Sequence, residues 1–307
     1  MRITAPDYYN EFSCIAGACR HSCCIGWEID IDGETLAFYD GIGGELGQRL
    51  QKNICREGGA HFCLDEKERC PFLNGQGLCD IIIEQGEDAL CQICDDHPRF
   101  RNFFSDREEI GLGLCCEAAA QLIVSRKEKT GMIVLEEGEE VLFLEEEAFL
   151  ALRKRVFTCL QDRSRPVFAR LERMLVLCGA EPLEFDAAVW AKELLSLERL
   201  SEERDIVLQK VLEMPDAVLP GEGWVETALE QLAVYFVFRH LADSLEDDRL
   251  TARAAFVDLS VRMIGAMAAA VYGEGLTCSD LAETARLYSS EVEYSPENLE
   301  ILLEKLS

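Results

Sequence analysis

The sequence has few basic residues for its length. Its 307 residues include 30 Lys and Arg against 58 Asp and Glu, so the formal net charge at pH 7 is −28. A protein this acidic repels the phosphates of DNA and RNA instead of neutralising them. The charge therefore argues against nucleic acid as a partner and favours a cationic partner.

Export and membrane signals are also lacking. The first residues, Met1 to Asp7, do not contain the apolar core of a signal peptide. The longest apolar stretch, from Met263 to Tyr272, is too short to cross a bilayer. We therefore expect a cytoplasmic protein without a membrane partner, in a compartment that keeps its thiols reduced.

No internal repeat and no low-complexity linker divides the chain, but its composition changes near residue 116. Up to this point the sequence is rich in cysteine and glycine, and beyond it Leu, Ala, Glu and Arg recur at helical spacing. We predict a cysteine-rich metal or iron–sulfur cluster domain over residues 1–116 and a helical domain over residues 117–307.

Apolar residues three and four positions apart predict helices through most of the second region. The segments with this spacing are residues 117–129, 146–160, 166–178, 185–197, 202–213, 224–244, 251–272 and 281–288. In the first region, residues 35–52 are predicted to be helical and residues 55–94 to be loop-rich. Residues 132–135 and 141–144 flank Gly138 and predict a β-hairpin.

These patterns together predict a mainly α fold. A cysteine-rich, loop-rich N-terminal domain is expected to pack on a helical C-terminal domain that carries one small β-hairpin. A doubly wound sheet is not expected. Although residues 41–47 superficially resemble a nucleotide-binding glycine loop, only a weak strand precedes them and no crossover unit follows.

Cysteine dominates the first region. Twelve of the fifteen cysteines lie between Cys14 and Cys116, and the first four form the run Cys14-x4-Cys19-x3-Cys23-Cys24. Adjacent cysteines rarely bridge each other, so this run cannot pair within itself without strain. Reduced, clustered thiols bind zinc or iron–sulfur clusters, and spacing alone does not separate the two. The alternative is a secreted disulfide scaffold, against which the odd number of cysteines and the helical second region weigh.

Further cysteine motifs follow in the same region. They are Cys70-Pro71-Phe72-Leu73, Gly77-Leu78-Cys79, Cys91-x2-Cys94, His97-Pro98-Arg99 and Cys115-Cys116. Short-range groups of thiols allow one loop to supply two ligands to the same metal. The sequence therefore predicts a metal centre in the first region.

Motifs at both ends of the chain occur together in one protein family. The N-terminal ones lie in residues 8–32 and in Cys70-Pro-Phe-Leu73, Gly77-Leu-Cys79, Cys94 and Pro98-Arg99. The C-terminal ones are Tyr235-Phe-Val-Phe-Arg239 and Tyr288-Ser289, with Glu293 and Asn298 following. With these motifs the chain resembles the flagellin lysine N-methylase family over nearly its whole length. The cysteine half is also similar to a wider group of zinc- or iron-chelating proteins.

The resemblance implies an S-adenosylmethionine-dependent methyltransferase that modifies lysine side chains of flagellin and carries a [4Fe-4S] cluster, with zinc as the alternative metal. The cysteines that match the family pattern are Cys14, Cys19, Cys23, Cys24, Cys70, Cys79, Cys94 and Cys115. A [4Fe-4S] cluster takes four ligands, and the sequence does not say which four. Cys55, Cys63, Cys91 and Cys116 lie outside the pattern.

Candidate pocket residues also come from the resemblance. Tyr288 and Glu293 are the catalytic candidates, and the candidates for binding the cofactor are Tyr8, Trp27, Arg99 and Asn298. Each has a structural alternative. Trp27 can be a core residue, Arg99 can bridge to a carboxylate, and Asn298 can cap a helix.

Two alternative functions remain open. The cysteine run departs from the Cys-x3-Cys-x2-Cys motif of radical enzymes, because Cys24 directly follows Cys23. A non-catalytic metal-binding or metal-delivery protein would need only the thiols, and so would an iron–sulfur electron carrier. The long helical region favours the methylase.

Overall fold

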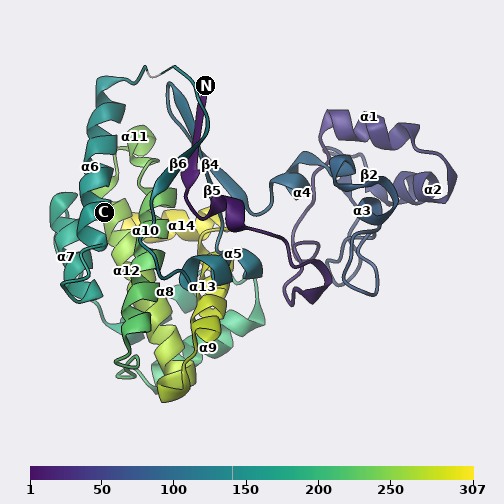
Figure 1. Cartoon of the computed structure of the whole chain (residues 1–307). Helices are drawn as coiled ribbons and strands as arrows, with labels where there is room; N and C mark the ends of the chain where they lie inside the picture. Colours follow the sequence, from purple (N-terminus) through teal and green to yellow (C-terminus); the bar gives the residue numbers. More distant parts are fainter. Residues whose placement is uncertain (140) are drawn as a thin grey trace. The chain divides into compact units, whose positions relative to one another are not determined.

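The computed structural model describes residues 1–139 and 141–307. Their contacts divide into two compact units, drawn in Figure 1. The smaller unit is Ser13–Arg99, and the larger unit combines Met1–Phe12 with Phe100–Ser307. The composition of the sequence changes after residue 116, whereas these contacts group residues 100–116 with the helices that follow.

The larger unit is built mainly from helices, which confirms the mainly α fold class. Each segment predicted from apolar spacing in the second region has an observed counterpart. Its α-helices are α5 (Glu117–Val124), α6 (Leu144–Leu160), α7 (Val167–Leu177), α8 (Ala187–Ser196), α9 (Glu202–Glu213), α10 (Gly223–His240), α11 (Ser244–Asp247), α12 (Leu250–Tyr272), α13 (Cys278–Val292) and α14 (Pro296–Lys305).

Helix α14 was not predicted, although its start carries the usual signals. The Ser295 hydroxyl accepts a hydrogen bond from the backbone N–H of Asn298, and Pro296 occupies the first turn. A serine cap followed by proline favours a helix start, because the cap satisfies one of the free N–H groups and proline needs no donor there. The apolar spacing over this short segment was too brief to show the helix.

Helices α10 and α12 lie at the centre of the larger unit, as Figure 1 shows. The segment Leu250–Gly275 is long and apolar enough to cross a membrane. This segment is longer than the apolar stretch recognised in the sequence, Met263 to Tyr272. However, 83% of the most apolar 18 residues of this segment is buried inside the protein. Helix α12 contacts α7, α9, α10 and α13, so its apolar surface is that of a core helix.

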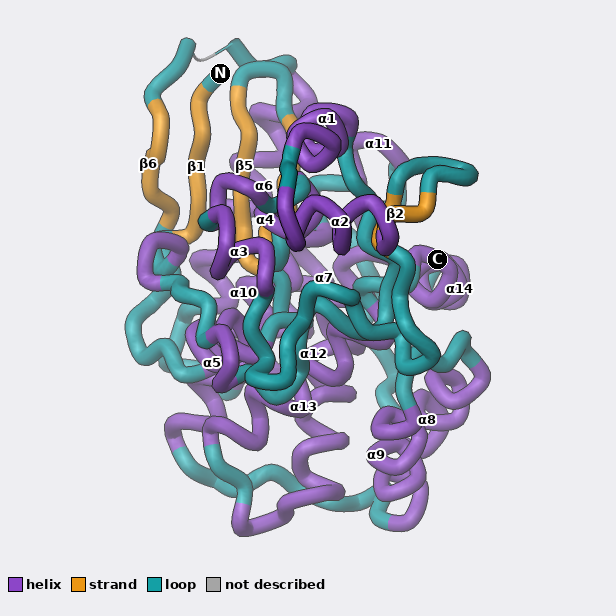
Figure 2. The backbone as a smooth tube through the Cα atoms, turned by 90° about the vertical axis from the view of Figure 1, so that its right-hand side faces the viewer, coloured by secondary structure: helices purple, strands orange, loops and turns teal. Residues whose placement is uncertain are grey.

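A four-stranded sheet lies beside these helices. Its strands are β1 (Arg2–Pro6), β4 (Arg99–Phe103), β5 (Arg107–Leu112) and β6 (Met132–Glu136), in the order β4-β5-β1-β6. Strand β1 pairs in parallel with β5 and antiparallel with β6, and the three strands run side by side in Figure 2. The first residues of the chain are therefore an integral part of the larger unit.

The predicted hairpin over residues 132–144 is wrong. Its first half is β6, but β6 pairs with β1, and Leu144 begins α6. Gly138 does not make a tight turn. It passes close to the chain start, where an added Cβ would lie 2.5 Å from the backbone nitrogen of Arg2. One residue of the predicted hairpin, Glu140, lies outside the described residues. The short connection between neighbouring strands is found elsewhere, where three residues join β4 to β5.

The smaller unit has short elements around a core of its own. They are α1 (Gly33–Gly41), α2 (Gly44–Asn53), β2 (Ile54–Cys55), β3 (His61–Phe62), α3 (Asp80–Gln85) and α4 (Gln92–Asp96). The single helix predicted over residues 35–52 is two helices. Gly44 adopts a φ of +73°, and a Cβ at Gly47 would lie 2.0 Å from the carbonyl oxygen of Ile42, so the break depends on glycine. The buried core side chains include Tyr39, Leu50, Phe62, Phe72 and Ile81.

A buried ion pair fixes α6 against the sheet. Arg153 of α6 donates two hydrogen bonds to the Glu109 carboxylate of β5, with N···O distances of 2.7 and 2.5 Å. Both side chains are almost completely buried, and the guanidinium also lies over the ring of Phe149. The two hydrogen bonds of such a pair hold both side chains in one geometry. If one residue of the pair is removed, the other remains as an unpaired buried charge, which lowers the stability of the folded protein.

We therefore predict that Arg153→Ala lowers the free energy of unfolding by about 3 to 5 kcal/mol, because Glu109 then stays buried without a cation. Arg155→Ala, on the exposed side of the same helix, should change it by less than about 0.5 kcal/mol. Urea unfolding followed by circular dichroism measures both. Equal losses in the two variants would contradict this role of Arg153.

Candidate functional site

Five cysteines from three separate segments of the smaller unit gather into what we call the five-thiol cluster. They are Cys24, Cys70, Cys79, Cys91 and Cys94. The Cys70 thiol interacts electrostatically with each of the other four. Backbone hydrogen bonds hold the segments in place, from Cys70 N to Cys24 O at 2.8 Å and from Cys94 N to Cys91 O at 2.9 Å.

Burial and hydrogen bonding change the acidity of these thiols. A hydrogen bond with the Cys23 side chain lowers the pKa of Cys24 to about 7, although burial opposes this. Burial raises the pKa of Cys70 to about 12 and also raises that of Cys79. Buried thiols lose their protons readily only when a cation compensates the negative charge. A bound metal ion supplies such a charge.

The donor set fits a thiolate-bound metal. All five groups are soft sulfur donors, which are the ligands of iron–sulfur clusters and of structural zinc. Cys91 is the member that lies outside the family pattern. Its Cys-x2-Cys spacing with Cys94 was the available signal, because that spacing lets one turn present two thiols together.

The remaining cysteines predicted as ligands lie elsewhere. The exposed Cys14 accepts a hydrogen bond from Ala16 N at 3.4 Å, and Cys19 donates one to the carbonyl oxygen of His21 at 3.3 Å. Cys23 contacts the five-thiol cluster through Cys24. Cys115 belongs to the larger unit, where its thiol bonds to the Tyr294 side chain.

Cys55 and Cys63 form a disulfide beside the strand pair β2–β3, with their Cα atoms 5.6 Å apart. The expectation that all thiols are reduced is wrong for this pair. Both residues lie outside the family pattern, so the disulfide removes no predicted ligand.

Two cofactor candidates also lie in the smaller unit. The partly exposed Trp27 donates its indole N–H to the carbonyl oxygen of Cys23 at 2.7 Å, and its ring lies 6.3 Å from that of His97. Arg99 donates to the carbonyl oxygen of Asp95 at 2.9 Å, at the end of α4. Trp27 is thus positioned beside Cys23, and Arg99 bonds to a backbone carbonyl of α4.

A second cluster lies buried in the larger unit, centred on Glu293. Its carboxylate accepts hydrogen bonds from Tyr235 Oη at 3.1 and 3.2 Å and lies 2.6 Å from His240 Nε2. Arg239 Nε lies 3.2 Å from the Glu293 carboxylate, and the Arg239 guanidinium lies over the ring of Tyr294. We call these five residues the Glu293 cluster. Three of them, Tyr235, Arg239 and Glu293, come from the two C-terminal sequence motifs, which the fold brings together.

The Glu293 cluster carries a balanced buried charge. Burial opposes ionisation of Glu293, but Arg239 and the hydrogen bond from His240 outweigh it and lower the pKa of the carboxyl group. Burial lowers the pKa of His240, so its ring is neutral and donates Nε2–H to the carboxylate. Glu293 is therefore ionised and paired with the guanidinium of Arg239.

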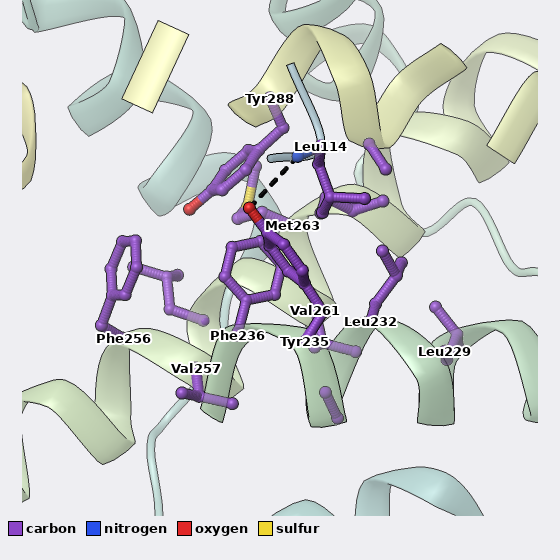
Figure 3. Close-up of a cluster of buried hydrophobic side chains, with 14 of the residues drawn as sticks. Leu114, Leu229, Leu232, Tyr235, Phe236, Phe256, Val257, Val261, Met263 and Tyr288 are labelled. Carbon is purple, nitrogen blue, oxygen red and sulfur yellow. Dashed lines mark hydrogen bonds between the residues drawn. The ribbon is translucent and has the colours of Figure 1, made fainter. Parts of the chain in front are cut away.

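The cluster also fixes the segment that carries Cys115. The backbone N–H of Leu114 donates to Tyr235 Oη at 3.2 Å, the contact drawn as a dashed line in Figure 3. Cys115 follows directly and bonds to Tyr294, another member of the cluster. Two members of the Glu293 cluster, Tyr235 and Tyr294, therefore hold the segment that carries this predicted metal ligand.

Tyr288 lies near the cluster, beside Phe236 in Figure 3. Its hydroxyl is 3.1 Å from Ser260 Oγ, and burial raises its pKa. Only 2% of Tyr288 and 7% of Glu293 is exposed, and a cavity of about 10 Å³ beside Tyr288 is too small for a cofactor. Neither catalytic candidate is open to a substrate in this conformation.

The last two candidates are held by protein contacts. Both amide hydrogens of Asn298 are donated, to the carbonyl oxygens of Glu198 and Glu291, and its oxygen accepts from Glu198 N. Asn298 thus joins three segments instead of capping a helix, a task performed by Ser295. Tyr8 is buried, with the guanidinium of Arg126 5.7 Å from its ring centre.

An open cleft of about 640 Å³ lies elsewhere on the larger unit. It is lined by exposed apolar side chains and by four carboxylates against one guanidinium. The lining residues are Arg101, Asn102, Phe103, Phe143, Leu144, Glu145, Glu146, Ala242, Asp243, Leu245 and Glu246. An acidic cleft with apolar walls suits a cation on an apolar stem.

Comparison with known proteins shows similarity to curated lysine-N-methylases. The chain is 25% identical over 132 residues to those of Salmonella typhimurium and Salmonella choleraesuis. The match covers 41% of this chain, less than the motifs indicated, and the chain spans about one third of the length of these relatives. It is also 26% identical over 132 residues to the flagellar biosynthetic protein FliU of Salmonella muenchen, covering 78% of that protein. No protein-family model and no solved structure matches the chain. The resemblance to flagellin lysine N-methylases seen in the sequence is thereby confirmed.

The Glu293 cluster predicts a specific pH dependence of stability. Folding lowers the pKa of Glu293, so this residue stabilises the folded protein fully at neutral pH. That stabilisation is lost as pH falls through the pKa of Glu293 in the folded protein, which lies below about 4.3. Since folding also lowers the pKa of His240, the unfolded chain takes up a proton first below about pH 6.5, which again reduces stability.

Glu293→Gln should lower the free energy of unfolding at pH 7 by about 3 to 5 kcal/mol, because Arg239 loses its buried partner. Between pH 5 and 3, the free energy of unfolding should fall less in this variant than in the wild type, because glutamine does not titrate. Urea unfolding at several pH values measures both effects, with the exposed Glu304→Gln as the control. A variant curve parallel to that of the wild type would rule out this linkage.

Proposed function

We propose that this protein transfers methyl groups from S-adenosylmethionine to lysine side chains of flagellin and carries a [4Fe-4S] cluster. The observation that carries the proposal is the five-thiol cluster, found in a chain similar to lysine-N-methylases. The flagellar name of a second relative supports flagellin as the substrate. A reducing compartment such as the cytoplasm would keep the five thiols available for the metal.

The ligands of the cluster come from the thiols that the fold brings together. Cys24, Cys70, Cys79 and Cys94 match the family pattern and lie in the five-thiol cluster. The lowered pKa of Cys24 lets this thiol lose its proton more readily than a free cysteine does. Zinc bound by the same thiolates is the alternative, which metal analysis separates from iron and sulfide.

Methyl transfer requires a lysine without its proton. A free lysine has a pKa of about 10.4, so its amine is charged near neutral pH and has no lone pair for attack. When bound, S-adenosylmethionine would supply a methyl group on its sulfonium sulfur: the lysine nitrogen would bond to the methyl carbon, the carbon–sulfur bond would break, and S-adenosylhomocysteine would leave. The protein must therefore provide a base and a place from which water is excluded.

Glu293 is the base in this proposal. It is ionised, and the hydrogen bond from His240 holds the carboxylate in place. Because its pKa is lowered, it would take the proton only from an amine whose own pKa is lowered by burial. The Tyr288 hydroxyl, held by Ser260, would orient the amine. Because both side chains are buried, this role requires the larger unit to open and admit the lysine. Trp27 and Arg99, which are partly exposed, are the cofactor contacts that we retain from the sequence.

The acidic cleft supports a lysine-bearing substrate. Its carboxylates, among them Glu145 and Glu246, attract an ammonium group, and the exposed Phe103 and Phe143 rings can cover an apolar lysine stem. Carboxylates raise the pKa of an amine, so this cleft would capture the lysine without activating it. The net charge of −28 adds long-range attraction that salt weakens.

The five-thiol cluster alone also fits a non-catalytic metal-binding or metal-delivery protein, or an iron–sulfur electron carrier. Either function would need only the smaller unit, and neither accounts for the Glu293 cluster. The activity test below decides between these functions and the methylase.

We predict that the anaerobically purified protein adds methyl groups to flagellin lysines in the presence of S-adenosylmethionine, as seen by mass spectrometry. Glu293→Gln should reduce the rate about a hundredfold or more, since a general base contributes 10² or more. Tyr288→Phe should also reduce it, and both variants should keep the wild-type absorption spectrum of the metal centre.

Glu304→Gln is the control for these variants and should transfer methyl groups at the wild-type rate. An intact metal centre together with unmethylated native flagellin would instead favour the metal-binding alternative.

A separate prediction concerns the metal itself. Serine at Cys24, or at its neighbour Cys23, should strip iron and sulfide from the protein, because the centre loses a ligand or the hydrogen bond that sustains it. Cys278→Ser in the larger unit should retain both. Iron and acid-labile sulfide per chain are the measurement. The claim fails if every single serine variant of the eight family-pattern cysteines keeps its full iron and sulfide.

A further inference from the structure

Cys91 is the one member of the five-thiol cluster that the family motifs leave out. It is completely buried and belongs to the core of the smaller unit. Buried cysteines often serve only as small apolar side chains, so burial alone does not make Cys91 a ligand. Its neighbours decide the question.

The backbone around Cys91 is held in one conformation. The hydroxyl of the buried Tyr39 donates to the carbonyl oxygen of Ala89 at 2.7 Å, two residues before Cys91. On the other side, Gln92 N donates to the Asp32 carboxylate at 2.9 Å. These two bonds hold the backbone on both sides of Cys91, and a rigid backbone is the support that a metal ligand requires.

The same turn directs Cys91 and Cys94 toward each other. The carbonyl oxygen of Cys91 accepts from Cys94 N at 2.9 Å and from Asp95 N at 3.0 Å, and the two thiols are hydrogen-bonded to one another. Cys70 also interacts electrostatically with Cys91 and with Cys94. One turn therefore presents two thiols together, which is the arrangement of a bidentate metal chelate.

We propose that Cys91 is a metal ligand that enters the centre together with Cys94, so that this chain builds its centre with a thiol outside the family pattern. The inference rests on the metal centre of the proposed function but not on methyl transfer. Its test measures metal and stability only, so it can fail while the methylase assay succeeds.

The first experiment compares three serine variants of the full chain, purified without oxygen. Cys91→Ser should lose at least half of its iron and sulfide, or hold them with an altered absorption spectrum if the serine oxygen binds. Cys94→Ser is the positive control. Cys178→Ser is the matched control, because Cys178 is an equally buried thiol in the core of the larger unit, and it should keep wild-type metal and spectrum. Wild-type metal content and spectrum in Cys91→Ser would overturn the proposal.

A second measurement separates a ligand from a core residue. Metal that binds only the folded protein raises its melting temperature, so metal-loaded and metal-free wild type should differ. In Cys91→Ser this difference should shrink by at least half, while the metal-free forms melt close together. If Cys91 served only packing, both forms would melt lower and the difference would stay.

A third measurement uses the wild type alone, in case Cys91→Ser does not fold. Brief alkylation followed by mass spectrometry should label Cys91 at least tenfold more slowly in the metal-loaded protein than after metal removal. Cys178 should react equally in the two forms. Equal rates at Cys91 would likewise overturn the proposal.

Discussion

The ionised carboxylate of Glu293 is the constraint on which the larger unit depends. A buried charge is tolerated only where cations and hydrogen-bond donors surround it, and here Tyr235, Arg239 and His240 of one helix supply them. Because all three donors lie on α10, the register between α10 and the end of α13 is fixed. The same tyrosine binds Leu114, so the segment leaving the sheet is fixed too. The segment leaving the sheet, the central helix and the end of α13 therefore meet at this buried polar cluster.

The helices could be predicted from the sequence because their information is local. Apolar spacing located α6 to α10 to within a few residues, since each helix buries one or more faces against its neighbours. The sheet could not be predicted in the same way. Strand β6 finds its partner in β1, more than a hundred residues away, and nothing in residues 132–144 records that pairing. Gly138 was interpreted as a turn residue, but it is glycine because the chain start passes close by.

The candidate sites show the same division between local and distant information. The cysteine motifs, Cys91-x2-Cys94 among them, predicted where thiols would gather, but only the folded backbone places Cys91 and Cys94 near Cys70. The two C-terminal motifs were recognised separately, and the fold unites them in the Glu293 cluster. Asn298 could not be interpreted in advance, because two of its three side-chain hydrogen bonds are made to Glu198, a hundred residues away.

The pairing of β1 with β5 makes the larger unit discontinuous along the chain. Arg2 is opposite Arg107, and the whole smaller unit is made between them. During synthesis, the first strand must therefore wait until about a hundred further residues have left the ribosome before its partner exists. The smaller unit, which is contiguous and has its own core, can fold in that interval. Folding of the larger unit depends instead on a pairing between segments far apart in sequence, which is the slower kind of step.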